Sequence, residues 1–162
     1  MQEPKIVEVD DRTLIAARMP MSLLENRTRE LWQGFRSRVT EIENRVGSDF
    51  FSIQHYPDNF NMANFRPDTV FEKLAGIEVE KRILIPNGME SYTLVGGKYA
   101  VFTHHGPAAE AAKTFQHIYG VWMPKSSYEP DSRDQFEILG PDYRPDDPKA
   151  KEQVWIPIKS YL

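Results

Sequence analysis

Cysteine is absent from the chain, which excludes disulfide bonds, thiolate metal sites and a cysteine nucleophile. An excess of positive charge is also absent. The 20 lysines and arginines are outnumbered by 24 aspartates and glutamates, and the formal net charge is −4. Proteins that bind nucleic acid normally carry a basic face that neutralises phosphates. The charge balance therefore argues against a direct nucleic-acid partner.

Long apolar runs are missing too. No stretch approaches the roughly 18 apolar residues that span a bilayer, and the first residues lack the apolar segment of a signal peptide. Hydrophobic residues still make up 40% of the 162 residues, which is enough for a packed core of ordinary domain size. We therefore expect a single domain over residues 1–162, located in the cytoplasm, without a membrane partner.

Several motifs of catalytic and cofactor-binding proteins do not occur. The chain has no Gly-rich phosphate loop followed by Lys-Ser/Thr and no Gly-x-Ser-x-Gly nucleophile turn. His104 and His105 are adjacent in an expected strand, where neighbouring side chains point to opposite faces and cannot easily share one ion. The sequence therefore predicts neither a metal site nor a cofactor.

Two segments have the apolar periodicity of helices. In the first, apolar residues recur at three- and four-residue steps from Leu24 to Val46. Ser22 and Glu25 before it have capping-box spacing, and Gly47 after it suits a C-terminal cap. The second helix is predicted to begin at Gly106-Pro107 and to end at Pro124. The residues expected to be buried on the two apolar stripes are Leu31, Phe35, Ile42, Phe115, Ile118 and Trp122.

The remaining pattern indicates strands in two similar halves. Asp10-Asp11 and Gly96-Gly97 have the form of two-residue hairpin turns. Residues 1–88 and 89–162 then share the order hairpin, helix, strand, loop, strand. We predict an α+β fold made of a duplicated ββαββ unit, with an antiparallel sheet, both helices on one face and a cleft between pseudo-symmetric halves. The expected strands are Lys5–Val9, Thr13–Arg18, Asp49–His55, Gly76–Ile85, Ser91–Val95, Lys98–His104, Gln135–Leu139 and Gln153–Lys159.

Glu137 is the acid that this pattern singles out. Strand alternation places Phe136 and Ile138 on one face and Glu137 on the other. The matching position in the first half is Ser52, so the repeated fold does not itself require a carboxylate there. From the residues alone, a solvent-facing acid is the simpler interpretation. If several aromatic residues of the second half shared its face, they would form a box for a cation.

Five short motifs then occur in order, and together they resemble one family. They are Tyr99-Ala-Val-Phe-Thr-His-His-Gly-Pro107, Trp122-Met-Pro124, Ser127-Tyr128-Glu129, Phe136-Glu137 and Glu152-Gln-Val-Trp-Ile-Pro-Ile-Lys159. This set resembles the gyrase-inhibitor-like effector-binding family. Its members are small-molecule-binding domains attached to AraC-type and multidrug-sensing transcription activators, and some are found alone.

The resemblance implies a fold and a pocket. The family's fold is the duplicated unit, and an acid that matches Glu137 holds cationic or amphipathic compounds among aromatic residues. The Tyr that the family often has two residues later is replaced by Leu139. No helix-turn-helix precedes the domain, because residues 1–21 are expected to form its first hairpin, so the chain resembles the stand-alone form. We take as candidate ligand-binding residues Glu137, Tyr128, Trp155, Trp122 and Tyr143, with Trp155 expected on Glu137's face.

Two other functions remain open at this stage. Some proteins of this fold resemble hydrolases of reactive small molecules, and Glu137 could act as a general base oriented by Tyr128 or Glu152. Stand-alone members resemble inhibitors of DNA gyrase, although a net charge of −4 is weak for a nucleic-acid mimic. A pocket with a second polar group near Glu137 would favour an enzyme, and an exposed acidic groove would favour an inhibitor.

Overall fold

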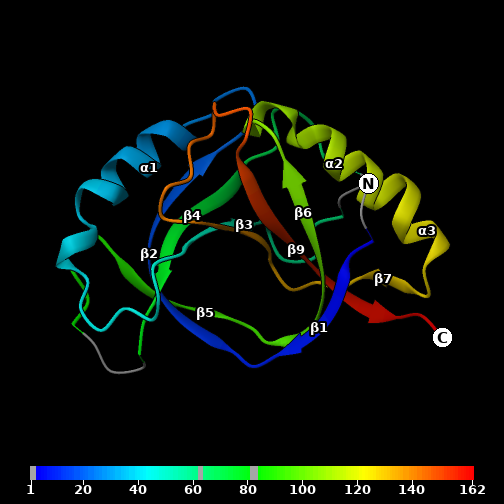
Figure 1. The fold of residues 1–162 in the computed structure, drawn as a ribbon, viewed down its shortest axis with the longest axis horizontal. Helices are drawn as coiled ribbons and strands as arrows, with labels where there is room; N and C mark the ends of the chain where they lie inside the picture. The colour runs from blue at the N-terminus through cyan, green and yellow to red at the C-terminus, as the bar shows by residue number, and fades with distance from the viewer. Residues whose placement is uncertain (1–2, 62–63, 81–83) are drawn as a thin grey trace.

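A computed structural model describes residues 3–61, 64–80 and 84–162 and has one curled antiparallel sheet (Figure 1). The strand order is β1-β6-β9-β8-β3-β4-β2-β5, and β7 pairs with β9. The strands are β1 (Lys5–Val9), β2 (Arg12–Met21), β3 (Phe50–His55), β4 (Phe71–Glu78), β5 (Glu90–Leu94), β6 (Gly97–His105), β7 (Tyr128–Pro130), β8 (Gln135–Leu139) and β9 (Lys151–Ser160).

Two helical segments cover the same face of this sheet (Figure 1). The first is α1 (Thr28–Ser37), which a 3-10 turn at Val39–Glu41 follows. The second begins with a 3-10 turn and contains a π-helical stretch. Its parts are Ala108–Glu110, α2 (Ala111–His117), the π-helical Ile118–Trp122 and α3 (Met123–Lys125). The α+β class, the antiparallel sheet and the placement of both helices on one face are confirmed. In the described ranges, no helix is long and apolar enough to cross a membrane.

The first helix is shorter than its apolar pattern predicts. Ser22 Oγ accepts a hydrogen bond from the Glu25 backbone N–H at 3.0 Å, as a capping box requires, but this closes a turn that precedes the helix. The Leu24 backbone N–H donates to the Pro67 carbonyl, which holds this turn against a neighbouring loop. At the other end, the Val46 N–H donates to the Glu78 carbonyl at 2.8 Å. This bond draws the chain down to the sheet and ends helical structure well before Gly47.

The two predicted hairpins are wrong, because their strands are exchanged between the halves. β1 pairs with β6, and β2 pairs with β5. The links at 9–12 and 94–97 therefore cross, and the Gly96 N–H donates to Asp11 Oδ1 at 2.6 Å. A Cβ on Gly96 would lie 2.4 Å from the Val9 carbonyl oxygen. A close crossing of the two links thus requires this glycine. The halves share one element order, and their superposition stays a prediction.

Apolar residues form a separate core under each helical segment. The core under α1 includes Leu31, Phe35 and Ile42, and the core under α2 includes Ile118. These four side chains are at most 4% exposed, so their predicted burial is confirmed. Phe115 and Trp122 are only partly buried, so that part of the expected stripe is less enclosed than predicted. A third core lies on the opposite face and includes Phe51, Phe136 and Trp155.

The crossing of the two links generates a prediction about Gly96. Gly96→Ala forces the added methyl group into the Val9 carbonyl, and such overpacking costs about 1–3 kcal/mol of unfolding free energy. Gly34→Ala is the matched control, because no atom lies within 4 Å of the added Cβ on the exposed face of α1. It should stabilise the protein by up to about 1 kcal/mol. Urea unfolding of both variants measures this, and equal stability of Gly96→Ala and the wild type would contradict the crossing.

Candidate ligand-binding site

Glu137 lies near the middle of the helix-covered face, in the region between the two helical cores. In β8 it stands directly opposite Ser52 of β3 and Val154 of β9. Strand alternation gives Gln135 the same face as Glu137. Phe115 of α2 lines the same pocket. The acid thus occupies the join between the halves, where the core under α1 ends and the core under α2 begins.

A chain of amide and phenol groups runs beside the acid. The Tyr119 hydroxyl donates to Gln135 Oε1 at 2.7 Å, and Gln135 Nε2 donates to Gln54 Oε1 at 3.1 Å. The Tyr56 hydroxyl donates to the same Gln54 oxygen at 3.1 Å. These side chains form their hydrogen bonds with one another and not with Glu137. Within the described ranges, no side chain forms a hydrogen bond with the carboxylate of Glu137.

Glu152 is a second acid next to Glu137. It lies two residues before Val154 on β9, so both acids share one face, and it is 5% exposed. The Tyr143 hydroxyl forms a hydrogen bond with Glu152. His104 stands opposite Glu152 across β6 and β9. Its two ring nitrogens contact Thr114 Oγ1 at 2.7 Å and the Pro107 carbonyl at 3.0 Å, so it fixes the start of α2 to the sheet.

The two carboxyl groups raise each other's cost of ionisation. Burial is the main cause that raises the pKa of Glu137 to about 7, and the charge of Glu152 adds to it. Lys73 and His104 act in the opposite direction. Burial also raises the pKa of Glu152, against the hydrogen bond from Tyr143 and the charge of Lys73. The pair therefore titrates as a unit in a site that is short of positive charge.

The space around Glu137 is small. The lining residues leave about 0 Å³ that a water-sized sphere can enter, whereas pockets for drug-sized ligands are about 300–1,000 Å³. Phe115 of α2 lines this space, and Tyr119, in the π-helical stretch that follows, is tied to the lining residue Gln135. π-Helical stretches are frequent at functional sites. A ligand that reaches Glu137 must therefore displace side chains of this helical segment.

Comparison with known families identifies the chain. The family model of the GyrI-like small molecule binding domain matches residues 2–159. The chain belongs to the GyrI-like family. The transcriptional regulator BrlR of Pseudomonas aeruginosa is 32% identical over 131 residues. That match covers 80% of this chain and 45% of BrlR, so the chain corresponds to less than half of that regulator's length.

Solved structures share the GyrI-like fold at low sequence identity. SAV2435, solved with bound tetraphenylphosphonium, has a TM-score of 0.70 and 14% identity, over 98% of this chain and 94% of its own. A protein described as a hydrolase, encoded by lin2189 of Listeria innocua, has a TM-score of 0.65 and 13% identity, over 97% and 92% of the two chains. At these identities the likeness shows the fold alone.

Trp155 is not on Glu137's face of the GyrI-like sheet, so that prediction is wrong. The strand register pairs Trp155 with Phe136, and Val154 with Glu137. Residues that are directly opposed share a face, and the next residue along the strand points to the other one. Trp155 therefore stacks on Phe136, with ring centroids 5.3 Å apart. Of the four residues predicted to accompany Glu137, Tyr143 lies near the two acids, because its hydroxyl interacts with Glu152.

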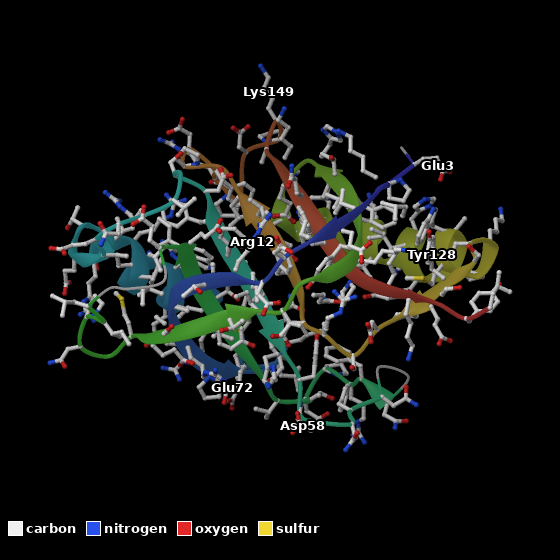
Figure 2. All side chains as sticks on the ribbon, turned by 90° about the horizontal axis from the view of Figure 1, so that it is seen from below. Glu3, Arg12, Asp58, Glu72, Tyr128 and Lys149 are labelled. Atoms are coloured by element: carbon white, nitrogen blue, oxygen red, sulfur yellow. The ribbon has the colours of Figure 1, made fainter. Side chains whose placement is uncertain are left out.

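Tyr128 and Trp122 lie away from the acid. Tyr128 pairs with Ser160, six residues beyond Val154 on β9, which corresponds to about 20 Å along a strand. In Figure 2, Tyr128 lies toward one end of the molecule. Trp122 stacks on Tyr128, with centroids 6.3 Å apart, and contacts Phe102 edge-on at 5.3 Å. Because Phe102 is in β6, Trp122 packs two strands away from Glu137.

The aromatic box lies on the opposite face of the sheet and already holds a cation of the chain itself. The Arg12 guanidinium is 5.1 Å from the ring centroid of Trp155 and 5.5 Å from that of Phe51. Figure 2 shows Arg12 near the centre of the molecule when it is viewed from below. The prediction that these aromatic side chains surround Glu137 is therefore wrong for Trp155. Its ring instead stabilises Arg12 at the start of β2.

Sequence reasoning missed most of the residues that surround Glu137. Gln54 and Gln135 could have been found from Glu137 by strand alternation, because each lies two residues from Ser52 or Glu137 on the shared face. The spacing of Tyr119 on the second helix predicts a core residue and gives no sign of its contact with Gln135. Lys73 could not be recognised as a site residue from the sequence, because its proximity to Glu137 depends on the pairing of β3 with β4. The further residues that the structure adds to the site are Tyr56 and Phe115, and Glu152, named above as a possible orienting group, lies next to Glu137.

The raised pKa of Glu137 generates a prediction about stability and pH. The unfolded acid has the ordinary glutamate pKa of 4.5, and the folded one has a pKa of about 7. Rising pH between these values therefore lowers the free energy of unfolding. Glu137→Gln removes this loss, so the variant should exceed the wild type by about 1–3 kcal/mol at pH 8. The difference should shrink toward zero as the pH falls to about 4.5.

Urea unfolding at pH 5, 6.5 and 8 measures this difference, with Glu110→Gln as the matched control because Glu110 is exposed. The control should follow the wild type at each pH. A Glu137→Gln variant whose stability stays parallel to the wild type across this range would show that Glu137 titrates as an ordinary surface acid.

Proposed function

We propose that this GyrI-like domain binds organic cations with apolar substituents and that Glu137 provides the counter-charge. The observation that carries the proposal is a partly buried carboxylate with a raised pKa and no hydrogen-bond partner among the described residues. Burying an acid without a partner costs free energy, and a bound cation restores that partner. Glu137 therefore favours cations over neutral and anionic molecules.

The surroundings of Glu137 suit the apolar part of such a ligand. Val154 and Phe115 line the pocket, and the two helical cores continue on either side. Removing apolar surface from water contributes about 25 cal/mol per Å², before the costs of binding. Such walls tolerate varied shapes, while the acid selects charge. SAV2435, which shares the fold, was solved with a cation of this kind, tetraphenylphosphonium, and this supports the proposal.

We further propose that binding serves to sense or sequester the cation in the cytoplasm. The match to part of BrlR, a transcriptional regulator, supports an effector-binding role. The net charge of −4 favours small molecules over direct contact with nucleic acid. An inhibitor that mimics nucleic acid would need an exposed acidic groove at the site, whereas Glu152, the acid next to Glu137, is 5% exposed. The buried position of this acid therefore does not favour the inhibitor.

A hydrolase is the second candidate, and the acid pair favours it. An acid with a pKa of about 7 is suited to act as a general base near neutral pH. Glu152, with its hydrogen bond from Tyr143, could orient the attacking water. If the site is hydrolytic, incubation with a strained electrophile such as styrene oxide should give the diol, and Glu137→Gln should abolish its formation. Unchanged styrene oxide with both proteins would leave binding as the function.

Calorimetric titration with tetraphenylphosphonium and neutral triphenylphosphine oxide tests the binding proposal. Glu137→Gln keeps the shape of the side chain and removes its charge. The variant should weaken cation binding by about 1–3 kcal/mol and leave the affinity for the neutral compound unchanged. Glu110→Gln, at the exposed start of the second helical segment, should bind both compounds as the wild type does. Equal losses for both compounds, or no loss for the cation, would remove Glu137 from the site.

A further inference from the structure

A second cavity, an open groove, lies on the α1 side of the molecule. It has a volume of about 990 Å³ and lies between the end of α1, the segment 42–48 and the turn after β8. None of its lining residues lines the pocket that contains Glu137. Its volume is within the range of small-molecule sites. The groove is therefore large enough for a ligand in the described structure, whereas the Glu137 pocket must first open.

The floor of this groove is apolar. Ile42, Phe50 and Ile77 line it and are 2%, 7% and 1% exposed. All three belong to the core under α1, so the floor is held by packing beneath it. Thr40, on the rim, adds a hydroxyl group. A flat apolar body can thus rest on the floor while polar groups at the rim contact its substituents.

The rim carries two arginines with no acidic partner in the described part of the chain. Arg36 and Arg45 both line the groove and are exposed. The neighbouring Arg38 is paired with Glu41 at 2.8 Å, whereas neither Arg36 nor Arg45 has a carboxylate within 4.0 Å among the described residues. The Arg36 guanidinium instead lies 4.5 Å from the ring centroid of Phe50.

We propose that this groove is a second ligand site that takes organic anions with a flat apolar body, such as aryl carboxylates or sulfonates. A guanidinium binds such anionic groups through two parallel hydrogen bonds, and Arg36 places its charge beside the aromatic floor. Glu43 also lines the groove, so the rim carries two positive charges and one negative charge. The site goes beyond the proposed function, because it selects charge of the sign opposite to that selected by Glu137.

Fluorescence titration with anilinonaphthalene sulfonate and its neutral counterpart phenylnaphthylamine tests the proposal. The double variant Arg36→Gln/Arg45→Gln should weaken binding of the sulfonate at least tenfold and leave the neutral compound unchanged. Both side chains are exposed, so we expect the variant to fold, and the single variant Arg45→Gln gives a smaller loss in the same direction. Arg29→Gln changes an exposed arginine of the same helix outside the groove and should have no effect.

Two further readouts locate the sulfonate. In amide NMR spectra, the Gly47 and Ser48 signals should shift on titration, because both residues line the groove. Glu137→Gln should leave sulfonate binding unchanged. A negative result for the groove can therefore be distinguished from a negative result for cation binding at Glu137. Unchanged sulfonate affinity in the double variant, equal losses for both compounds, or amide shifts confined to other regions would each overturn the second site.

Discussion

The pairing of β3 with β8 is the contact on which the rest of the structure depends. It joins the two halves in one sheet and sets Ser52 directly opposite Glu137. The helical segments each cover their own half and have separate cores, so these central strands carry the join between the cores. A carboxylate at this join is partly removed from water without lying inside a fully packed core. Its charge is therefore costly to the protein, and a cation can reach it once the side chains that line its pocket move.

The fold class could be predicted from the sequence because apolar periodicity separates helices from strands and fixes which faces are buried. The partner of each strand could not be predicted. The alternating pattern of a strand such as β1 is the same whether the strand pairs with the next strand or with β6. Gly96-Gly97 likewise has the composition of a hairpin turn in both cases. Trp155 was misplaced for the same reason, since its face relative to Glu137 depends on a register that only the β8–β9 pairing sets.

The position of Glu137 between the two halves could be predicted, and so could part of its surroundings. The alignment of the halves makes Ser52 and Glu137 equivalent positions, and in a two-fold arrangement equivalent positions of the central strands meet. The contact between Gln54 and Gln135 follows from the same relation. Tyr119 could not be placed, because its approach to the acid depends on how the second helical segment packs on the sheet. The sequence also contains no signal for the small size of the pocket.

Measuring the pKa of Glu137 with and without a cation tests directly whether its carboxylate is the counter-charge of a bound cation. Carbon NMR of the labelled glutamate carboxyl groups, assigned by comparison with Glu137→Gln, follows its ionisation across the pH range. We expect a pKa near 7 in the free protein and a clear fall when tetraphenylphosphonium is added, because the cation stabilises the carboxylate. A pKa near the ordinary glutamate value of 4.5 that does not move on addition of the cation would contradict this role of Glu137.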